Sequence, residues 1–80
     1  MIPITSSKTL GLVLRKYRKE QGLTQTQVGK KFNIRQASIS KIESGTAGVH
    51  IDTLFRLMSA LNLEMHMKSR NSASLDEELW

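Results

Sequence analysis

The stretch LTQTQVGKKFNIRQASISKIESG, residues 23–45, contains two short helical patterns separated by about one turn. The second pattern, over residues 35–43, has few apolar positions and carries small and polar side chains along most of its length. A helix that only fills a core would not have this composition, because burying polar groups without partners is costly. We therefore expect the chemistry of the chain on the exposed face of this helix.

The first of the two helices is predicted to begin after Thr24, which is followed three residues later by Gln27. This is the spacing of a capping box, in which each residue satisfies a backbone N–H at the start of the helix. Val28 and Phe32, four residues apart, form its buried side. Gly29 costs roughly 1 kcal/mol relative to alanine inside a helix, so we expect another backbone to approach it closely.

A tight turn separates the two helices. Asn33 tolerates left-handed backbone angles and suits the turn, and Ile34 is expected to anchor it to the core. The second helix is predicted over residues 35–43, with Ile39 and Ile42 buried and Ala37 beside them. Ser44 and Gly45 end it.

Two further helices flank this pair. The earlier helix is capped by Ser7, ends at Gly22, and has apolar residues at a helical spacing: Leu10, Val13, Leu14 and Tyr17. Its opposite face carries Arg15, Lys16, Arg18 and Lys19. The later helix is predicted over residues 51–61 and capped by His50. Its buried set is Ile51, Leu54, Leu57, Met58 and Leu61, with Phe55 to one side.

The period changes after Asn62, where Leu63, Met65 and Met67 alternate with polar residues. Alternation predicts a half-buried strand. One strand in a helical chain has no ladder partner, so we expect the same strand of a second copy, antiparallel across a two-fold axis. Leu63, Met65 and Met67, with Phe55, are assigned to this dimer interface. The alternative is a frayed extension of the preceding helix.

Composition limits the class of protein. Eighty residues make one domain, and without cysteine the chain has no disulfides and no thiolate metal site. No spacing suggests a catalytic triad, and no glycine loop suits a phosphate. His50 and His66 lack neighbouring ligands. We therefore expect no enzyme, no metal and no cofactor.

Charge points to a polyanionic partner. Residues 1–70 hold all twelve lysines and arginines and only four acids, a net charge of +8. Nucleic acid is the commonest partner of such a basic body. The chain has no apolar run of the ~18 residues needed to span a membrane and no signal-peptide pattern. A cytoplasmic, nucleoid-associated location is expected.

Two short helices joined by a tight turn can dock on DNA, the first across the phosphates and the second in the major groove. There Gln36 can bond an adenine edge and Arg35 a guanine, although Arg35 could hold a phosphate instead. Ala37 permits close approach and can touch a thymine methyl. Ser40 and Lys41 lie farther along the same face. Gln25 is placed to meet a phosphate.

The opening stretch resembles the helix-turn-helix of the lambda-repressor-like (Xre) family. The matching positions are Leu23-Thr24-Gln25, Val28-Gly29, Asn33-Ile34, Gln36, Ile39-Ser40 and Glu43-x-Gly45. Gly29 stands where alanine is usual in the family and Asn33 where glycine is usual, and both changes are sterically mild. The resemblance implies base contacts from Arg35, Gln36, Ala37 and Ser40, and phosphate contacts from Gln25, Ser38 and Lys41.

The later part of the chain is similar to HipB-type antitoxins, on the strand pattern over residues 61–67 and a polar tail that ends Glu77-Glu78-Leu79-Trp80. That resemblance implies a homodimer joined by its strands, which represses its own operon and binds a HipA-like serine/threonine kinase toxin. Leu79 and Trp80 form an isolated apolar pair in the acidic tail, and we expect them to dock on the toxin.

The predicted fold is therefore all-α, a four- to five-helix lambda-repressor-like domain with a C-terminal strand. Its parts are an arm over 1–6, the helix-turn-helix domain over 7–62, the dimerisation strand over 63–69 and a disordered acidic tail over 70–80. The predicted function is an operator-binding repressor and antitoxin. The alternatives are a stand-alone phage or chromosomal repressor without a toxin, and a pure protein-interaction module.

Overall fold

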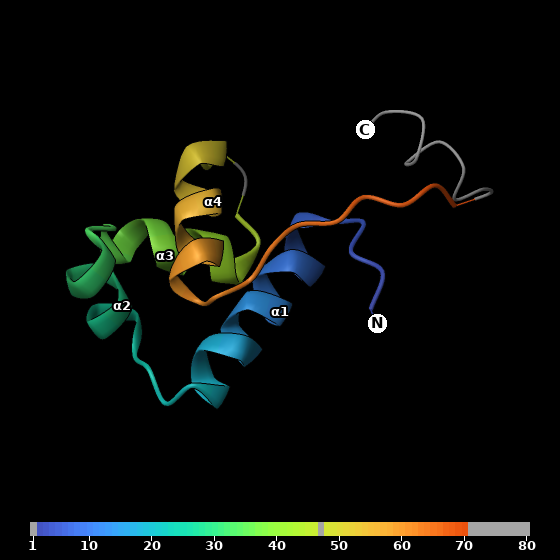
Figure 1. The fold of residues 1–80 in the computed structure, drawn as a ribbon. Helices are drawn as coiled ribbons and strands as arrows, with labels where there is room; N and C mark the ends of the chain where they lie inside the picture. The colour runs from blue at the N-terminus through green and yellow to red at the C-terminus, as the bar shows by residue number, and fades with distance from the viewer. Residues whose placement is uncertain (1, 47, 71–80) are drawn as a thin grey trace.

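A computed structural model describes residues 2–46 and 48–70. Its helices are α1 (Ser7–Glu20), α2 (Gln25–Phe32), α3 (Gln36–Ser44) and α4 (Ile51–Ala60). Each of α1, α2 and α4 packs on α3 (Figure 1). The predicted all-α helix-turn-helix fold is confirmed, and the described residues contain no strand.

The core lies between the helices, on the inner side of α3. Its eight buried apolar residues come from all four helices, the turn after α2 and the end of α4: Leu14, Val28, Ile34, Ile39, Ile42, Leu57, Met58 and Leu61. As predicted, Ile34 anchors the turn. Because α3 supplies Ile39 and Ile42 to this core, its opposite face is left to solvent.

Two glycines let helices approach at backbone distance. A Cβ on Gly29 would lie 2.6 Å from the carbonyl oxygen of Ile34, which confirms the predicted close approach. A Cβ on Gly11 would lie 2.6 Å from the carbonyl oxygen of Glu43 and would also collide with that of Ile42. The crossing of α1 over α3 therefore depends on Gly11, which the sequence pattern did not reveal.

The helix ends follow local chemistry. The capping box of α2 is present, with the Thr24 hydroxyl accepting from the Gln27 N–H and the Gln27 side chain accepting from the Thr24 N–H. Asn33 ends α2 with a φ of 56°, as expected for the turn. The first helix is capped by Ser6, so the assignment to Ser7 was wrong by one residue. His50 precedes α4, but its side chain makes no capping hydrogen bond.

Several burial predictions were wrong at the edges of the helical stripes. On α1 the inward row is Gly11, Leu14 and Arg18, so Arg18 is buried whereas Tyr17 is exposed. Ile51, the first residue of α4, is 63% exposed. Ala37 is exposed on the outer face of α3 and does not support the core.

The segment after α4 is extended, and the described residues offer it no partner strand. Leu61 caps α4, and Asn62, with a φ of 60°, turns the chain away from the helix, so a continued helix is excluded. Residues 63–69 are not assigned to a strand, and the described residues contain no second strand with which they could form a ladder. Leu63 packs partly on the core, whereas Met67 is 80% exposed.

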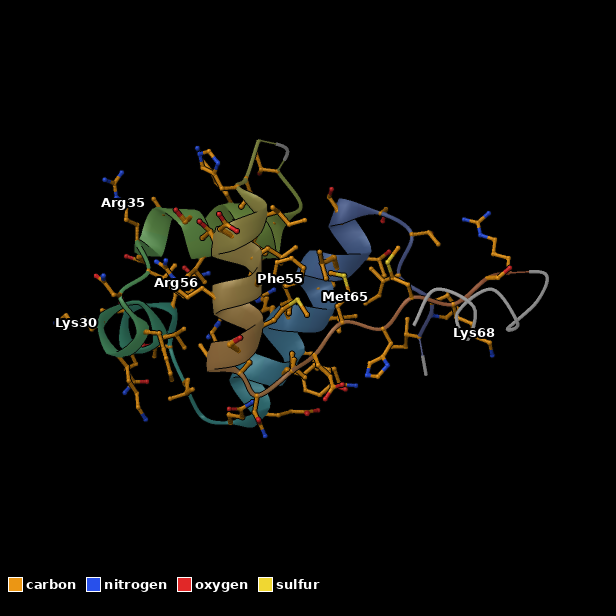
Figure 2. The ribbon with its side chains drawn as sticks, turned by 45° about the horizontal axis from the view of Figure 1, so that its top comes forward. Lys30, Arg35, Phe55, Arg56, Met65 and Lys68 are labelled. Carbon is orange, nitrogen blue, oxygen red and sulfur yellow. The ribbon has the colours of Figure 1, made fainter. Side chains whose placement is uncertain are left out.

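The two described ends of the chain lie on the same side of the molecule (Figure 1). The arm before α1 and the segment after α4 both run past the first turn of α1 (Figures 1 and 2). Of the predicted tail over 70–80 only Arg70 is described, so the expectations for Leu79 and Trp80 lie outside the described residues.

Candidate nucleic-acid interface

The outer face of α3 is polar, small and open. Gln36, Ala37, Ser40 and Lys41 are exposed, Ser38 is half-buried, and Arg35 stands exposed at the N-cap position. Their orientation is set by Ile39 and Ile42, which hold the other side of the helix in the core. No acid points outward from α3, because its single carboxylate, Glu43, is buried. This face can enter a groove and offer hydrogen bonds without repelling an anion.

Gln36 and Gln25 connect this face to α2. The amide nitrogen of Gln36 donates to the Gln25 side-chain oxygen at 3.4 Å. The amide nitrogen of Gln25 in turn donates to Oε1 of Glu43 at 3.1 Å. Gln25 is therefore both acceptor and donor in a chain that runs from the surface to the interior, and its rotamer restricts that of Gln36.

Arg18 of α1 and Glu43 of α3 form the buried end of this chain. Arg18 Nε donates to Glu43 Oε2 at 2.6 Å, and Arg18 Nη2 donates to Oε1 at 2.8 Å. The third nitrogen, Nη1, donates to the carbonyl oxygen of Leu23 at 2.6 Å. The two side chains are only 7% and 4% exposed. Such a two-bond guanidinium–carboxylate pair fixes orientation as well as distance.

The charge on Glu43 is maintained by its partners. Burial by itself raises the pKa of this carboxyl, but the hydrogen bonds from Arg18 and Gln25 and the charges of Arg18 and Arg15 lower it, and the net shift is downward. The same pair raises the pKa of Arg18, chiefly through its hydrogen bond to Glu43. The pair is therefore ionised at neutral pH, and Glu43 can accept from Gln25 as a carboxylate.

These contacts connect three helices: the end of α1, the start of α2 and the last turn of α3. Arg18 comes from α1, Gln25 from the first residue of α2, and Glu43 from the last turn of α3. Sequence reasoning assigned Arg18 to the solvated face and gave Glu43 no structural part. The available signal was spacing, because Arg18 lies four residues after Leu14 and Glu43 four after Ile39, on the buried rows.

The three residues predicted to contact phosphates differ in their exposure to solvent. Lys41 is exposed, Ser38 is half-buried, and Gln25 is half-buried within the hydrogen-bond chain. Gln25 lies on the first turn of α2, where backbone N–H groups have no acceptor within the helix. Thr26, the next residue, is exposed there and was not predicted. The start of α2 and the outer face of α3 thus adjoin, through the Gln36–Gln25 contact.

Further cations lie around the turn. Lys30, Arg35 and Arg56 are gathered at the end of the domain where α2 meets α3, whereas Lys68 lies at the opposite end (Figure 2). Arg56 of α4 donates from Nη1 to the carbonyl oxygen of Asn33 at 3.4 Å. All four of these side chains are exposed.

The residues assigned to a dimer interface occupy α4 and the extended segment. Phe55 and Met65 are each 44% exposed, Met67 is 80% exposed, and Leu63 is half-buried (Figure 2 labels the first two). Among the described residues no group of three or more His, Cys, Asp or Glu could hold a metal. Over the same residues, no helix has the length and apolar character needed to cross a bilayer.

The fold and this face define a helix-turn-helix domain. The family described as helix-turn-helix matches residues 14–66. Antitoxin HipB of Escherichia coli strain K12 is 31% identical over 71 residues, which cover 89% of this chain and 81% of HipB.

Solved structures agree with these matches. A chain of the HipA-HipB-O2-O3 complex has a TM-score of 0.81 at 28% identity, covering 88% of this chain and 99% of that one. A chain of C.Esp1396I bound to a 19 base pair DNA duplex has a TM-score of 0.64 at 29% identity, covering 72% and 77%. The protein belongs to the Xre-like helix-turn-helix family, which includes the HipB antitoxins. The resemblance stated from the sequence is confirmed.

Proposed function

We propose that this protein is a sequence-specific DNA-binding repressor that places α3 in the major groove. One observation carries the proposal: Gln36 is exposed on a slim polar helix, yet a hydrogen-bond chain to the interior restrains it. A restrained amide loses less conformational entropy when it pairs with a base edge than a free one does. The similarity to C.Esp1396I, which is bound to a DNA duplex, supports the same reading.

The roles follow from the position of each side chain. Gln36 reads an adenine edge, Arg35 a guanine or a phosphate, and Ala37 and Ser40 approach the base edges closely. Phosphates are held by three further residues: Gln25, Ser38 and Lys41. Because the amide nitrogen of Gln25 donates to Glu43 and its oxygen accepts from Gln36, the donors left for a phosphate are its second amide hydrogen and the first backbone N–H groups of α2.

We infer that two copies bind one palindromic operator. Pairing through residues 63–69 and Phe55 would present two recognition helices about one turn of DNA apart, ~34 Å. Two observations support this dimer: residues 63–68 are extended but belong to no strand of the described chain, and Met67 is 80% exposed.

We further propose that the protein is the antitoxin of a toxin–antitoxin operon in the bacterial cytoplasm, acting on the nucleoid. It represses that operon and binds a HipA-like serine/threonine kinase, with Leu79 and Trp80 as the docking residues. The support is the similarity to HipB, which occurs in a complex with HipA. A stand-alone repressor shares the DNA-binding part of this proposal and lacks the kinase partner.

Footprinting of the purified full chain on its own promoter tests the DNA-binding part. We expect two protected half-sites and an affinity that falls steeply as salt rises, because phosphate contacts release counterions. Absence of any salt-dependent footprint would favour a protein-interaction module instead. Co-purification of the neighbouring gene products tests the antitoxin part, and deletion of residues 72–80 should weaken a kinase complex while sparing the footprint.

A further inference from the structure

We propose that the segments after α4 of two copies pair antiparallel about Met65. Glu64 of each copy then lies opposite His66 of the second copy, and Leu63 lies opposite Met67. The proposal rests on the proposed dimer and adds the register and the polar contacts that select this chain as its own partner.

The alternation of side chains limits the possible registers. In an antiparallel pair, residues directly opposite each other point to the same face. Leu63, Met65 and Met67 form one face and Glu64, His66 and Lys68 the other. A two-fold axis between two residues would place apolar side chains opposite polar ones, so the axis must pass through a residue. Glu64, Met65 and His66 are the candidates near the middle.

Only one of these three axes gives suitable partners to the side chains on both faces of the paired strands. An axis at Glu64 brings the two Glu64 carboxylates face to face and sets Met67 opposite Leu61, which is buried at the end of α4. An axis at His66 gains a Glu64–Lys68 pair but sets Leu63 opposite Ser69. An axis at Met65 gives apolar partners to all three apolar residues and pairs Glu64 with His66 twice.

The burial along the segment supports the same centre. Exposure rises from half-buried Leu63 through Met65 at 44% to Met67 at 80%. Leu63 packs against the core of its own domain. An axis at Met65 carries each Met67 to Leu63 of the second copy, and so to the edge of that copy's core. Met67, the most exposed of the three apolar residues, therefore meets Leu63, the most buried of the three, in the other copy.

The polar face of the segment carries the carboxylate and imidazole groups that the proposed cross-strand pairs require. Within one chain, Nε2 of His66 lies 2.7 Å from Oε2 of Glu64. The two side chains are 74% and 83% exposed, so each can turn toward a partner across the strand. In the proposed register each Glu64 has two imidazole neighbours, one within its strand and one opposite, and Lys68 flanks His66 on the same face. The second copy offers the same groups in the reverse order.

A single-cysteine scan of the full chain tests the register, because the chain has no cysteine of its own. The variants Glu64→Cys, Met65→Cys and His66→Cys are oxidised mildly and their disulfide dimers are followed on a gel. We expect Met65→Cys to cross-link with itself, since residues directly opposite have Cα atoms ~4.5–5.5 Å apart. Glu64→Cys and His66→Cys should cross-link only when mixed, because each lies diagonal to its own copy, at ~7–8 Å.

Self-linking of Glu64→Cys or His66→Cys as fast as Met65→Cys would overturn the register, as would no linking at all. Sedimentation of the unmodified chain is measured in parallel. A monomer there refutes the proposed dimer itself, whereas a dimer with the wrong cross-links refutes only the register.

Charge reversal tests the polar pairs. Glu64→Lys removes two favourable pairs from the dimer, and we expect its dissociation constant to rise about two- to thirty-fold. Adding His66→Glu to Glu64→Lys places opposite charges across the strands and should recover most of this loss. Asp52→Lys, an exposed acid on the first turn of α4, is the control with the same charge change. Equal effects of Glu64→Lys and Asp52→Lys would refute the pairing.

Discussion

Replacing Arg18 by methionine tests whether the buried ion pair holds the domain in its binding geometry. The substitution keeps an unbranched apolar stem but removes both hydrogen bonds to Glu43 and the one to Leu23. Leaving one partner of a buried pair unpaired costs about 3–5 kcal/mol. Stability for 80 residues is about 4–12 kcal/mol at the usual value per residue. We expect Arg18→Met to lose a large fraction of it.

The assay is urea unfolding followed by the helical circular dichroism signal. With a slope of about 1–3 kcal/mol per molar urea, the midpoint should fall by at least 1 M, within the ~1–5 M these values span. Arg15→Met is the matched control, because Arg15 lies on the same helix, is exposed and acts on Glu43 only through its charge; a change within about 0.5 kcal/mol is expected there. The double variant Arg18→Met with Glu43→Leu should recover much of the loss. Equal midpoints for Arg18→Met and Arg15→Met would refute the reasoning.

Three further predictions concern the contacts around this pair. Alanine at Gly11 should destabilise by about 1–3 kcal/mol through overpacking against α3, whereas an unobstructed glycine-to-alanine change in a helix stabilises, so the sign of the shift in thermal midpoint decides it. The pKa of Glu43 is lowered in the folded state, so its contribution to stability is complete above the unfolded pKa of about 4.3 and is lost as the pH falls through the folded pKa. Glu43→Gln should therefore be less stable than the parent at pH 7, and its stability should depend less on pH in acid titrations followed by circular dichroism. Gln25→Ala frees the side chain of Gln36 and should weaken operator binding in a mobility shift by roughly 1 kcal/mol beyond the loss of a phosphate contact; a loss no larger than that of Lys41→Ala contradicts the positioning role.

The turn and the start of α2 were predictable because their chemistry is local. Thr24 and Gln27 satisfy each other's backbone groups within one turn, and Asn33 adopts a conformation that few other residues tolerate. The need for a close neighbour at Gly29 followed from the cost of glycine in a helix, and the structure places the Ile34 carbonyl there.

The interior of the site was not predictable in the same way. Arg18 and Glu43 are charged, and charged residues at the edge of a helical stripe are ordinarily assigned to solvent. Their spacing from Leu14 and Ile39 was compatible with burial, but the partner that makes burial of each charge affordable comes from the other helix, where α1 and α3 approach at Gly11. Tyr17 of the same helix, which the spacing placed on the buried side, is 42% exposed.

The segment over residues 63–69 was predictable only in part. Its alternation was readable from the sequence, yet a ladder needs two strands and the described residues contain no second one. In the proposed dimer a second copy supplies the missing strand, and the self-complementary order of Glu64 and His66 is the sequence feature that argues for such a copy.

The central claim is that Gln36 reads a base, and binding of Gln36→Ala to every single-base variant of the operator measures it most directly. We predict a loss of ~1–3 kcal/mol on the parent operator together with lost discrimination at one base pair per half-site. Lys41→Ala, exposed on the same helix, should instead weaken binding to all variants equally and reduce the salt dependence. A uniform loss with Gln36→Ala, with discrimination unchanged at every position, would contradict the account.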